Sequence, residues 1–343
     1  MKTRTKILII ILLCFLALIS SIAIGSVTIS SREIIRIIGN QFFQTPLSDQ
    51  IQPTTVTIVW NIRLPRTFMA FMVGAALSIS GAVMQSMLRN PLASSYTLGV
   101  SSGASLGAAI VIVFGLQLPF LGIFTLPFVG FLGGFATVML IMGVTVRLDK
   151  NMTNHTIILV GMIFSLFMNA LLTLITAFSR QYLEQLVFWQ MGSFAGRSWE
   201  EVQIVTVITT IGILGFMKYS KELDIMTFGE DRAVAMGVEL KKVKIYLIGI
   251  CSLLTGAVVS FVGIIGFVDL IVPHLTRKMF SSSHQLFLPL TALIGGGFMV
   301  MADLVSRTII APSELPIGAV TALLGAPFFA TLFFKNRKKG GLS

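Results

Sequence analysis

Residues 63–93 read RLPRTFMAFMVGAALSISGAVMQSMLRNPLA, an apolar run with charged or turn-forming residues at both ends. Arg63 and Arg66 flank Pro65, and a helix tolerates proline in its first turn, where the missing N–H would have no intrahelical partner. Asn90-Pro91 ends the run, because the residue before a proline disfavours the helical region. The run can cross a bilayer, since about 20 apolar residues span the hydrocarbon. The sequence therefore predicts a membrane-spanning helix over 64–87.

Similar apolar runs follow one another along the whole chain. Hydrophobic residues make up 55% of the 343 residues and charged residues only 11%. Helices satisfy their backbone N–H and C=O groups without water, so a multi-pass helical protein fits this composition and a water-soluble enzyme does not. We expect an all-α, polytopic integral membrane protein with about ten crossings, forming one transmembrane domain over 1–343. The expected crossings are 7–26, 64–87, 96–115, 125–146, 155–178, 201–217, 244–262, 264–280, 286–308 and 315–334. The eighth contains Asp269 and Pro273, so a broken or tilted helix is the alternative there.

The positions of Lys and Arg indicate how the chain crosses the membrane. These side chains resist translocation and therefore accumulate in cytoplasmic loops. If both termini are cytoplasmic, 18 of the 25 Lys and Arg residues fall on the inner side. The net charge of +11 is spread over both ends and several loops, which suits membrane topology and anionic lipid better than nucleic acid. We therefore predict that both termini are cytoplasmic.

Three connectors are long enough to carry function. Residues 218–243 form the longest inner connector, in which apolar residues stand among nearly balanced charges. That mixture suits short helices presented to a protein partner, whereas a solvated linker would be rich in Gly, Ser and Pro. The outer connectors are 28–62, where 31–42 suit an interfacial helix, and 179–200. Aromatic residues in the latter suit the headgroup level: Tyr182, Phe188, Trp189 and Trp199.

Small residues form stripes inside the expected crossings. Gly99, Gly103 and Gly107 follow a GxxxGxxxG spacing, and Gly130 and Gly134 repeat it. Such stripes let helix backbones approach closely in a bilayer. The two cysteines and three histidines show neither a disulfide framework nor the ligand spacing of a metal site.

Several segments in the same order resemble a known family. Residues 63–93, GFVDLIVPHLTR at 266–277 and DLVSRTIIAPSELPIGAVTALLGAPFF at 303–329 closely resemble the permease subunits of bacterial ABC importers for ferric siderophores, haem and cobalamin. The resemblance extends from about Ile58 to Phe334 and so covers almost the whole chain.

The resemblance implies a transporter subunit that does no covalent chemistry. Family members have ten crossings, pair with the same or a related permease, attach two ATPase subunits on the inner side and receive a substrate-binding protein on the outer side. This chain has no GxxxxGK[ST] phosphate loop, so ATP and Mg would be used by the partner ATPase, and we expect no cofactor on this chain. The implied location is the bacterial plasma (inner) membrane. Ferric siderophore is the expected cargo because it is the commonest in the family, with haem and cobalamin as alternatives.

The resemblance also assigns roles to individual residues. Arg63, Arg66 and Arg307 correspond to outward arginines that receive acidic residues of the binding protein. Alternatively, Arg63 and Arg66 only extend their side chains toward the aqueous interface, and Arg307 pairs with Asp303 at the i, i+4 spacing of a helix. The connector 218–243 corresponds to the cytoplasmic coupling loop that fits the ATPase. Its expected contact residues are Phe228, Gly229, Glu230, Arg232, Ala233, Met236 and Gly237, and the expected cytoplasmic gate residues are Asn90, Thr153 and Asn154.

One acid departs from the family pattern. Asp269 stands where the family usually has Gly, and a carboxylate at membrane depth is unfavourable unless it is paired or wetted. We expect it either to pair with a basic residue such as Arg277 or to face a water-filled path. Two other classes compete with the permease. An ion-coupled secondary transporter would concentrate more ionisable residues near the midplane, and an intramembrane enzyme would need a nucleophile and base that no spacing here unites.

Overall fold

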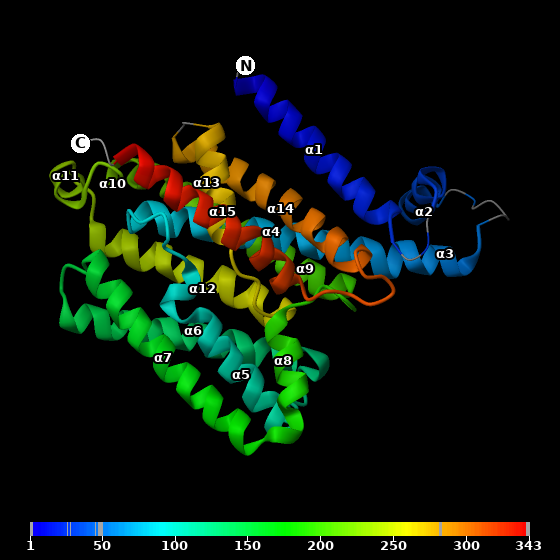
Figure 1. The fold of residues 1–343 in the computed structure, drawn as a ribbon, viewed down its shortest axis with the longest axis horizontal. Coiled ribbons are helices and arrows are strands. Elements are labelled where there is room, and N and C mark those ends of the chain that lie inside the picture. Colours follow the sequence, from blue (N-terminus) through cyan, green and yellow to red (C-terminus); the bar gives the residue numbers. More distant parts are fainter. Residues whose placement is uncertain are drawn as a thin grey trace.

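The computed structural model describes residues 3–25, 27, 29–44, 46, 51–280 and 283–340, and within them it contains helices and no strand. Most of the helices lie side by side in one bundle (Figure 1). The first half contains α1 (Thr3–Ala23), α2 (Ser31–Phe43), α3 (Pro53–Thr57), α4 (Leu64–Met87), α5 (Val100–Phe114), α6 (Thr125–Leu148) and α7 (Asn154–Phe178). The second half contains α8 (Leu183–Met191), α9 (Trp199–Lys218), α10 (Ser220–Met226), α11 (Glu230–Ala235), α12 (Leu240–Val262), α13 (Val268–Met279), α14 (His284–Thr308) and α15 (Ile317–Gly340). A π-helix over Ile58–Arg63 joins α3 to α4, and single 3-10 turns occupy Ser95–Leu98, Gly122–Phe124 and Arg180–Tyr182.

All ten expected crossings contain a helix, but their lengths differ. Seven helical segments of the described chain are long and apolar enough to cross a membrane, and α5 and the apolar part of α15 are shorter. The segment expected to cross at 264–280 is helical only from Val268 to Met279, 12 residues. At 1.5 Å per residue it is about 18 Å long, against about 30 Å of hydrocarbon. The all-helical class is confirmed, while the count of ten full crossings stays a prediction.

The ends of the chain agree with an even number of passes through the bundle. In Figure 1, α1 starts toward the end of the bundle that carries α10, α11 and the last turns of α15, and it finishes beside α2 near the opposite end. The assignment of that shared end to the cytoplasm remains a prediction from charge.

Helix α4 lies at the centre of the bundle. Of its 24 residues, 21 are buried, and α14, α9, α13 and α12 pack around it. Two glycines permit the closest approaches. A Cβ on Gly74 would lie 2.3 Å from the carbonyl oxygen of Gly295 in α14, and one on Gly81 would lie 1.9 Å from that of Asp269 in α13. Because lipid supplies no hydrophobic force between helices, such backbone contact is a main source of their association.

The glycine stripe expected in 99–107 lies in the contact between α5 and α6. A Cβ on Gly103 would lie 2.2 Å from Thr137 Oγ1, and one on Gly107 would lie 2.6 Å from the carbonyl oxygen of Val129. From the other helix, a Cβ on Gly133 would lie 2.4 Å from the carbonyl oxygen of Gly103. The predicted packing role of this stripe is confirmed.

The segment expected to form an interfacial helix is α2. Ser30 and Glu33 form a capping box at its start, which satisfies two backbone N–H groups that the helix leaves free. Its buried face carries Ile34 and Ile37, and its other face exposes Ile35 and Phe43. Residues 28, 45 and 47–50 of the expected outer connector lie outside the described part of the chain.

We expect Gly74→Ala to destabilise the protein by about 1–3 kcal/mol, because the added methyl overpacks the α4–α14 contact. Gly143→Ala is the matched control, since a Cβ there would have no described atom within 4 Å. Alanine also favours a helix over glycine by up to about 1 kcal/mol. Thermal unfolding of the detergent-solubilised protein measures both variants. Equal melting temperatures for the two would contradict the packing role of Gly74.

Candidate functional site

The three arginines predicted to receive a partner lie together, and all three are buried. Arg63, Arg66 and Arg307 are 6%, 8% and 8% exposed, so they are not free groups on the outer rim. Arg63 and Arg66 stand on either side of the start of α4, and Arg307 is in the last turn of α14. The sequence placed them correctly in one region, but it did not predict that other parts of the chain already occupy their donors.

Arg63 binds the end of α1. Its Nη1 donates to the carbonyl oxygens of Ile22 and Ala23 at 2.8 and 2.9 Å, and its Nη2 donates to that of Val27. The last carbonyls of a helix have no intrahelical donors. The guanidinium group of Arg63 therefore closes α1 and fixes it to the start of α4.

Arg307 reaches the same helix end from α14. Its Nη1 donates to the carbonyl oxygen of Ile24 at 2.7 Å, and its Nη2 donates to the carbonyl oxygen of Ser21. The predicted pair with Asp303 is present in a weak form, with Nε of Arg307 3.5 Å from Oδ2 of Asp303. Arg307 thus holds α1 against α14 in addition to any role toward a partner.

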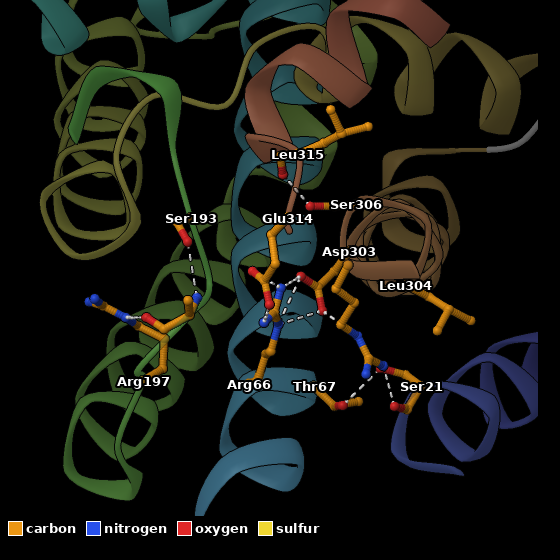
Figure 2. Close-up of polar contacts among 12 residues, drawn as sticks. Ser21, Arg66, Thr67, Ser193, Arg197, Asp303, Leu304, Ser306, Glu314 and Leu315 are labelled. Atoms are coloured by element: carbon orange, nitrogen blue, oxygen red, sulfur yellow. Dashed lines mark hydrogen bonds and ion pairs between the residues drawn. The ribbon is translucent and has the colours of Figure 1, made fainter. Parts of the chain in front are cut away.

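Arg66 lies between two carboxylates of its own chain. Its Nε and Nη2 donate to both oxygens of Asp303 at 2.8–3.1 Å, and Nη1 and Nη2 donate to Glu314 at 2.7 and 3.0 Å. Figure 2 shows Arg66 on α4 between Asp303 on α14 and Glu314 on the segment that leads to α15. Asp303 is almost fully buried, whereas the side chain of Glu314 is 39% exposed.

The cluster of Arg63, Arg66, Arg307, Asp303 and Glu314, called the arginine cluster below, has a net positive charge and lies next to a cavity. Its three guanidinium groups face two carboxylates, which leaves one positive charge without a carboxylate of the cluster. All three arginines and Glu314 line a cavity of about 220 Å³. The guanidinium group that faces no carboxylate is that of Arg63, which binds backbone carbonyls and lines the same cavity as Glu314.

The connector 218–243 forms two short helices at the other end of the bundle. Gly229 and Gly237 precede and follow α11 with φ of +117° and +87°, values that glycine adopts without the clash of a side chain. Phe228 and Met236 are each 61% exposed, so two large apolar side chains stand on the surface of a connector that also carries charged residues. Of the seven residues expected to contact the ATPase, Arg232 and Gly237 are also exposed, and Gly229 and Glu230 are half-buried.

Ala233 differs from the other expected contact residues. It is fully buried and belongs to the main apolar core of the bundle. Its methyl group therefore fixes α11 to the bundle and does not form part of the exposed surface of the connector.

The segments expected to form the cytoplasmic gate lie next to each other. Nδ2 of Asn154, at the start of α7, donates to the carbonyl oxygen of Leu88 at 3.2 Å, just after the end of α4. Asn90 follows in the same tight turn, where its side chain accepts a hydrogen bond from the N–H of Leu92 at 2.9 Å. The structure thus joins the end of α4 to the connector before α7, as the gate prediction requires, although gating itself is untested.

Asp149 organises the connector before α7. Its carboxylate accepts hydrogen bonds from the N–H groups of Asn151 and Thr153 and from the hydroxyl groups of Thr153 and Thr156. The bonds from Thr153 are the main cause that lowers the pKa of Asp149 from 3.8 to about 2. Thr153 therefore has a structural role here, in holding the connector before α7 together, besides its expected place in the gate.

Lys244 was counted in the sequence only as one more inner cation. It is fully buried in α12, and its Nζ donates to the carbonyl oxygen of Met152 at 2.7 Å and to Oε1 of Glu230 at 2.9 Å. No clear signal in the sequence marks it, because Lys244 stands at the start of the helix close to Lys241 and Lys242, which are exposed.

Asp269 has a different partner from the one expected. Its carboxylate accepts a hydrogen bond from the hydroxyl of Ser94, and its Oδ1 has no hydrogen-bond partner among the described residues. Arg277 instead donates to Ser86 Oγ at 3.1 Å and lies over the ring of Phe287 at 4.5 Å. The expected pairing of Asp269 with Arg277 is therefore wrong. Asp269 is also only 1% exposed, so in this structure it does not face water.

Three side chains that no spacing united in the sequence do meet in the structure. Nδ1 of His284 lies 2.6 Å from Oδ1 of Asp224, and Nε2 lies 2.7 Å from Oγ of Ser86. The order of Asp, His and Ser matches that of a hydrolase triad. However, Ser86 and His284 are 4% and 3% exposed, and Arg277 also binds the serine hydroxyl. A substrate cannot reach the serine, so the arrangement braces α4, α10 and α14.

A bundle of long apolar helices, with an exposed connector at one end and an arginine cluster at the other, suits a multi-pass subunit of a membrane transporter. The model of the FecCD transport family matches residues 10–335, and the chain belongs to that family. It is 42% identical to the uncharacterized ABC transporter permease protein YvrB of Bacillus subtilis (strain 168), over 94% of this chain and 92% of YvrB. It is 35% identical to the cobalamin import system permease protein BtuC of Halobacterium salinarum, over 84% of this chain and 77% of that protein.

A solved structure supports the same assignment. The structure of an inward-facing metal-chelate type ABC transporter matches with a TM-score of 0.83 at 32% identity, over 97% of this chain and 99% of that one. The chain is therefore a permease of an ABC importer. Relatives at 32–35% identity are named for cobalamin, molybdate, hemin and iron(3+)-hydroxamate, so the family does not define one cargo.

We expect Asp303→Asn to destabilise the protein by about 3 kcal/mol or more, because it removes one partner of a buried charge pair. Glu314→Gln is the matched variant at the other carboxylate, and its partial exposure limits the expected loss to about 1 kcal/mol. Chemical unfolding of the purified permease in detergent measures the difference. If the two variants lose the same stability, Asp303 is not the main counter-ion of Arg66.

We expect the connector before α7 to open at low pH. The folded pKa of Asp149 lies below its ordinary value, so its hydrogen bonds stabilise the connector above about pH 4 and are lost as the pH falls through about 2. The rate of amide hydrogen exchange in residues 151–156, corrected for the intrinsic rate, should increase as the pH falls through this range. Asp149→Asn should abolish the dependence on pH, and an unchanged profile in that variant would refute the assignment.

Proposed function

We propose that this permease is half of a membrane dimer that imports a ferric siderophore, driven by two separate ATPase subunits and supplied by a substrate-binding protein. The observation that carries the proposal is the connector 218–243, two short helices with exposed apolar residues at one end of a membrane bundle. An exposed apolar patch bordered by charges is a typical docking surface for a protein. The second permease is the same chain or a related one, and the complex lies in the bacterial plasma membrane.

The ATPase surface would be formed by the exposed residues of α11 and its flanks. Phe228 and Met236 supply apolar area, and Arg232 supplies a charge near the rim. The sequence has no GxxxxGK[ST] loop, so ATP and Mg would be bound by the partner. Closure of the two ATPases would move the coupling helices and so switch the dimer between outward-open and inward-open arrangements, with gate segments at Asn90, Thr153 and Asn154.

The binding protein would dock at the outer arginine cluster. Guanidinium groups make paired, directional hydrogen bonds to carboxylates. The cavity lined by Arg63, Arg66 and Arg307 could admit an acidic side chain of the partner beside Glu314. In this view the cluster has two functions, closing the end of α1 and presenting the remaining positive charge to the partner.

The cargo is proposed within the range that the family carries. We prefer ferric siderophore because it is the commonest cargo of the family, and haem and cobalamin are the alternatives. Molybdate also appears among the named relatives. An ion-coupled secondary transporter receives less support, because the two acids buried within α13 and α14, Asp269 and Asp303, are already bonded to Ser94 and Arg66. No cofactor is proposed for this chain.

The test is uptake into proteoliposomes that contain the permease, its genomically adjacent ATPase and its binding protein. We expect ATP-dependent uptake of a ferric hydroxamate in preference to haem, cobalamin and molybdate, with no uptake when either partner is omitted. Phe228→Asp should abolish uptake, because it places a charge in the apolar contact with the ATPase. Uptake without ATPase would contradict the whole proposal, whereas ATP-driven uptake of a different cargo would contradict the siderophore alone.

A further inference from the structure

Lys244 occupies an unusual position for a lysine in an apolar helix. It is the fifth residue of α12, and none of its side chain is exposed. A buried ammonium group is strongly unfavourable unless acceptors replace its water. Lys244 has two such acceptors, and they belong to separate parts of the chain: the carbonyl oxygen of Met152 at 2.7 Å and Oε1 of Glu230 at 2.9 Å.

Each acceptor lies in a segment with an assigned mechanical role. Glu230 is the first residue of α11, within the connector that the proposed function gives to the ATPase. Met152 belongs to the connector before α7, and its φ of +50° is uncommon for a residue other than glycine. The hydrogen bonds of Asp149 hold that connector together, so a displacement at Met152 moves Thr153 and the start of α7 with it.

A cavity between α11 and the connector before α7 increases the importance of Lys244 for holding these two segments together. A cavity of about 800 Å³ separates the two segments, lined on one side by Asn151 and Thr153 and on the other by Val234 and Gly237. Close packing therefore does not join the segments at that level. Lys244, which does not line the cavity, joins them through two directional hydrogen bonds.

The series of contacts continues to the end of α4. Asn154, next to the same connector, donates to the carbonyl oxygen of Leu88 at 3.2 Å. A continuous series thus runs from α11 through Lys244 and the connector to the turn that contains Asn90. Coupling between distant sites travels through such packed and hydrogen-bonded elements.

We propose that Lys244 is a positioning residue that transmits displacement of the coupling helix α11 to the cytoplasmic gate. The proposal rests on the proposed function, because it needs an ATPase that moves α11. A lysine suits this role since its ammonium group holds two acceptors at a fixed separation, which an apolar side chain of similar length does not.

The experiment measures gate movement without the cargo. A reporter cysteine replaces Leu92, which is 58% exposed beside Asn90, and both native cysteines are buried. Proteoliposomes contain the permease with its ATPase, and the rate of labelling by a maleimide is compared with and without ATP. ATP hydrolysis is measured in the same samples.

We expect Lys244→Met to keep ATP hydrolysis while the nucleotide-dependent change in labelling falls by about twofold to thirtyfold. Lys6→Met is the matched control, because Lys6 also donates to a backbone carbonyl, that of Met279 at 2.9 Å, and lies outside both segments. This control should keep the full response. A role in stability alone would lower the amount of folded protein and leave the response per folded molecule unchanged.

If Lys244→Met does not fold, Glu230→Gln provides a second variant. The side chain of Glu230 is 28% exposed, and glutamine has nearly the same shape as glutamate. It should weaken the response in the same direction, and the double variant should be no worse than Lys244→Met alone, as expected for two residues of one contact. A full response in Glu230→Gln and in any folded Lys244→Met protein would overturn the inference. If the unmodified permease binds no ATPase or shows no response to ATP, the proposed function is wrong and the inference falls with it.

Discussion

The close approach of backbones along α4 is the constraint on which the rest of the molecule depends. At Gly74 and Gly81 the neighbouring carbonyl oxygens of α14 and α13 lie where a side chain would stand. In lipid the helices gain little from hydrophobic burial, so contact of this kind replaces it. Because α4 is held on nearly all sides, both of its ends occupy defined positions. Its first turn carries the arginine cluster, and the turn that contains Asn90 follows its last residue.

The two ends of α4 are held by different forces. At the start of α4, buried guanidinium groups bind α1, α14 and the segment before α15 through charge-assisted hydrogen bonds. Removing one member of such a network leaves a buried charge without its partner, which is strongly unfavourable. At the other end, Ser86 of α4 still belongs to buried contacts with His284 and Arg277, and beyond the helix a hydrogen bond from Asn154 joins Leu88 to the connector before α7. Local opening is easier where contacts are few, so the connector that borders the cavity of about 800 Å³ opens more easily than α4 itself.

The sequence predicted the fold class well because composition decides it. Apolar runs of the right length can only be helices in a bilayer, and every expected crossing contains one. The prediction overestimated the segment 264–280, since Phe267 has a positive φ and helix α13 starts only at Val268. Hydrophobicity alone does not report such a break. The stripe of Gly103 and Gly107 was also predicted correctly, because its spacing directly specifies one face of a helix.

The candidate sites were harder to predict because they depend on long-range partners. The motif gave the positions of Arg63 and Arg66, but their acceptors come from α1, α14 and the segment before α15, more than thirty residues away in every case. The same holds for Asp269, whose partner Ser94 lies 175 residues away, and for Lys244, which binds Met152 across 92 residues. A single sequence shows that a buried charge needs a partner and does not show which one. The structure supplies that choice, and the proposed link from α11 to the turn at Asn90 depends on the contacts that it places around Lys244.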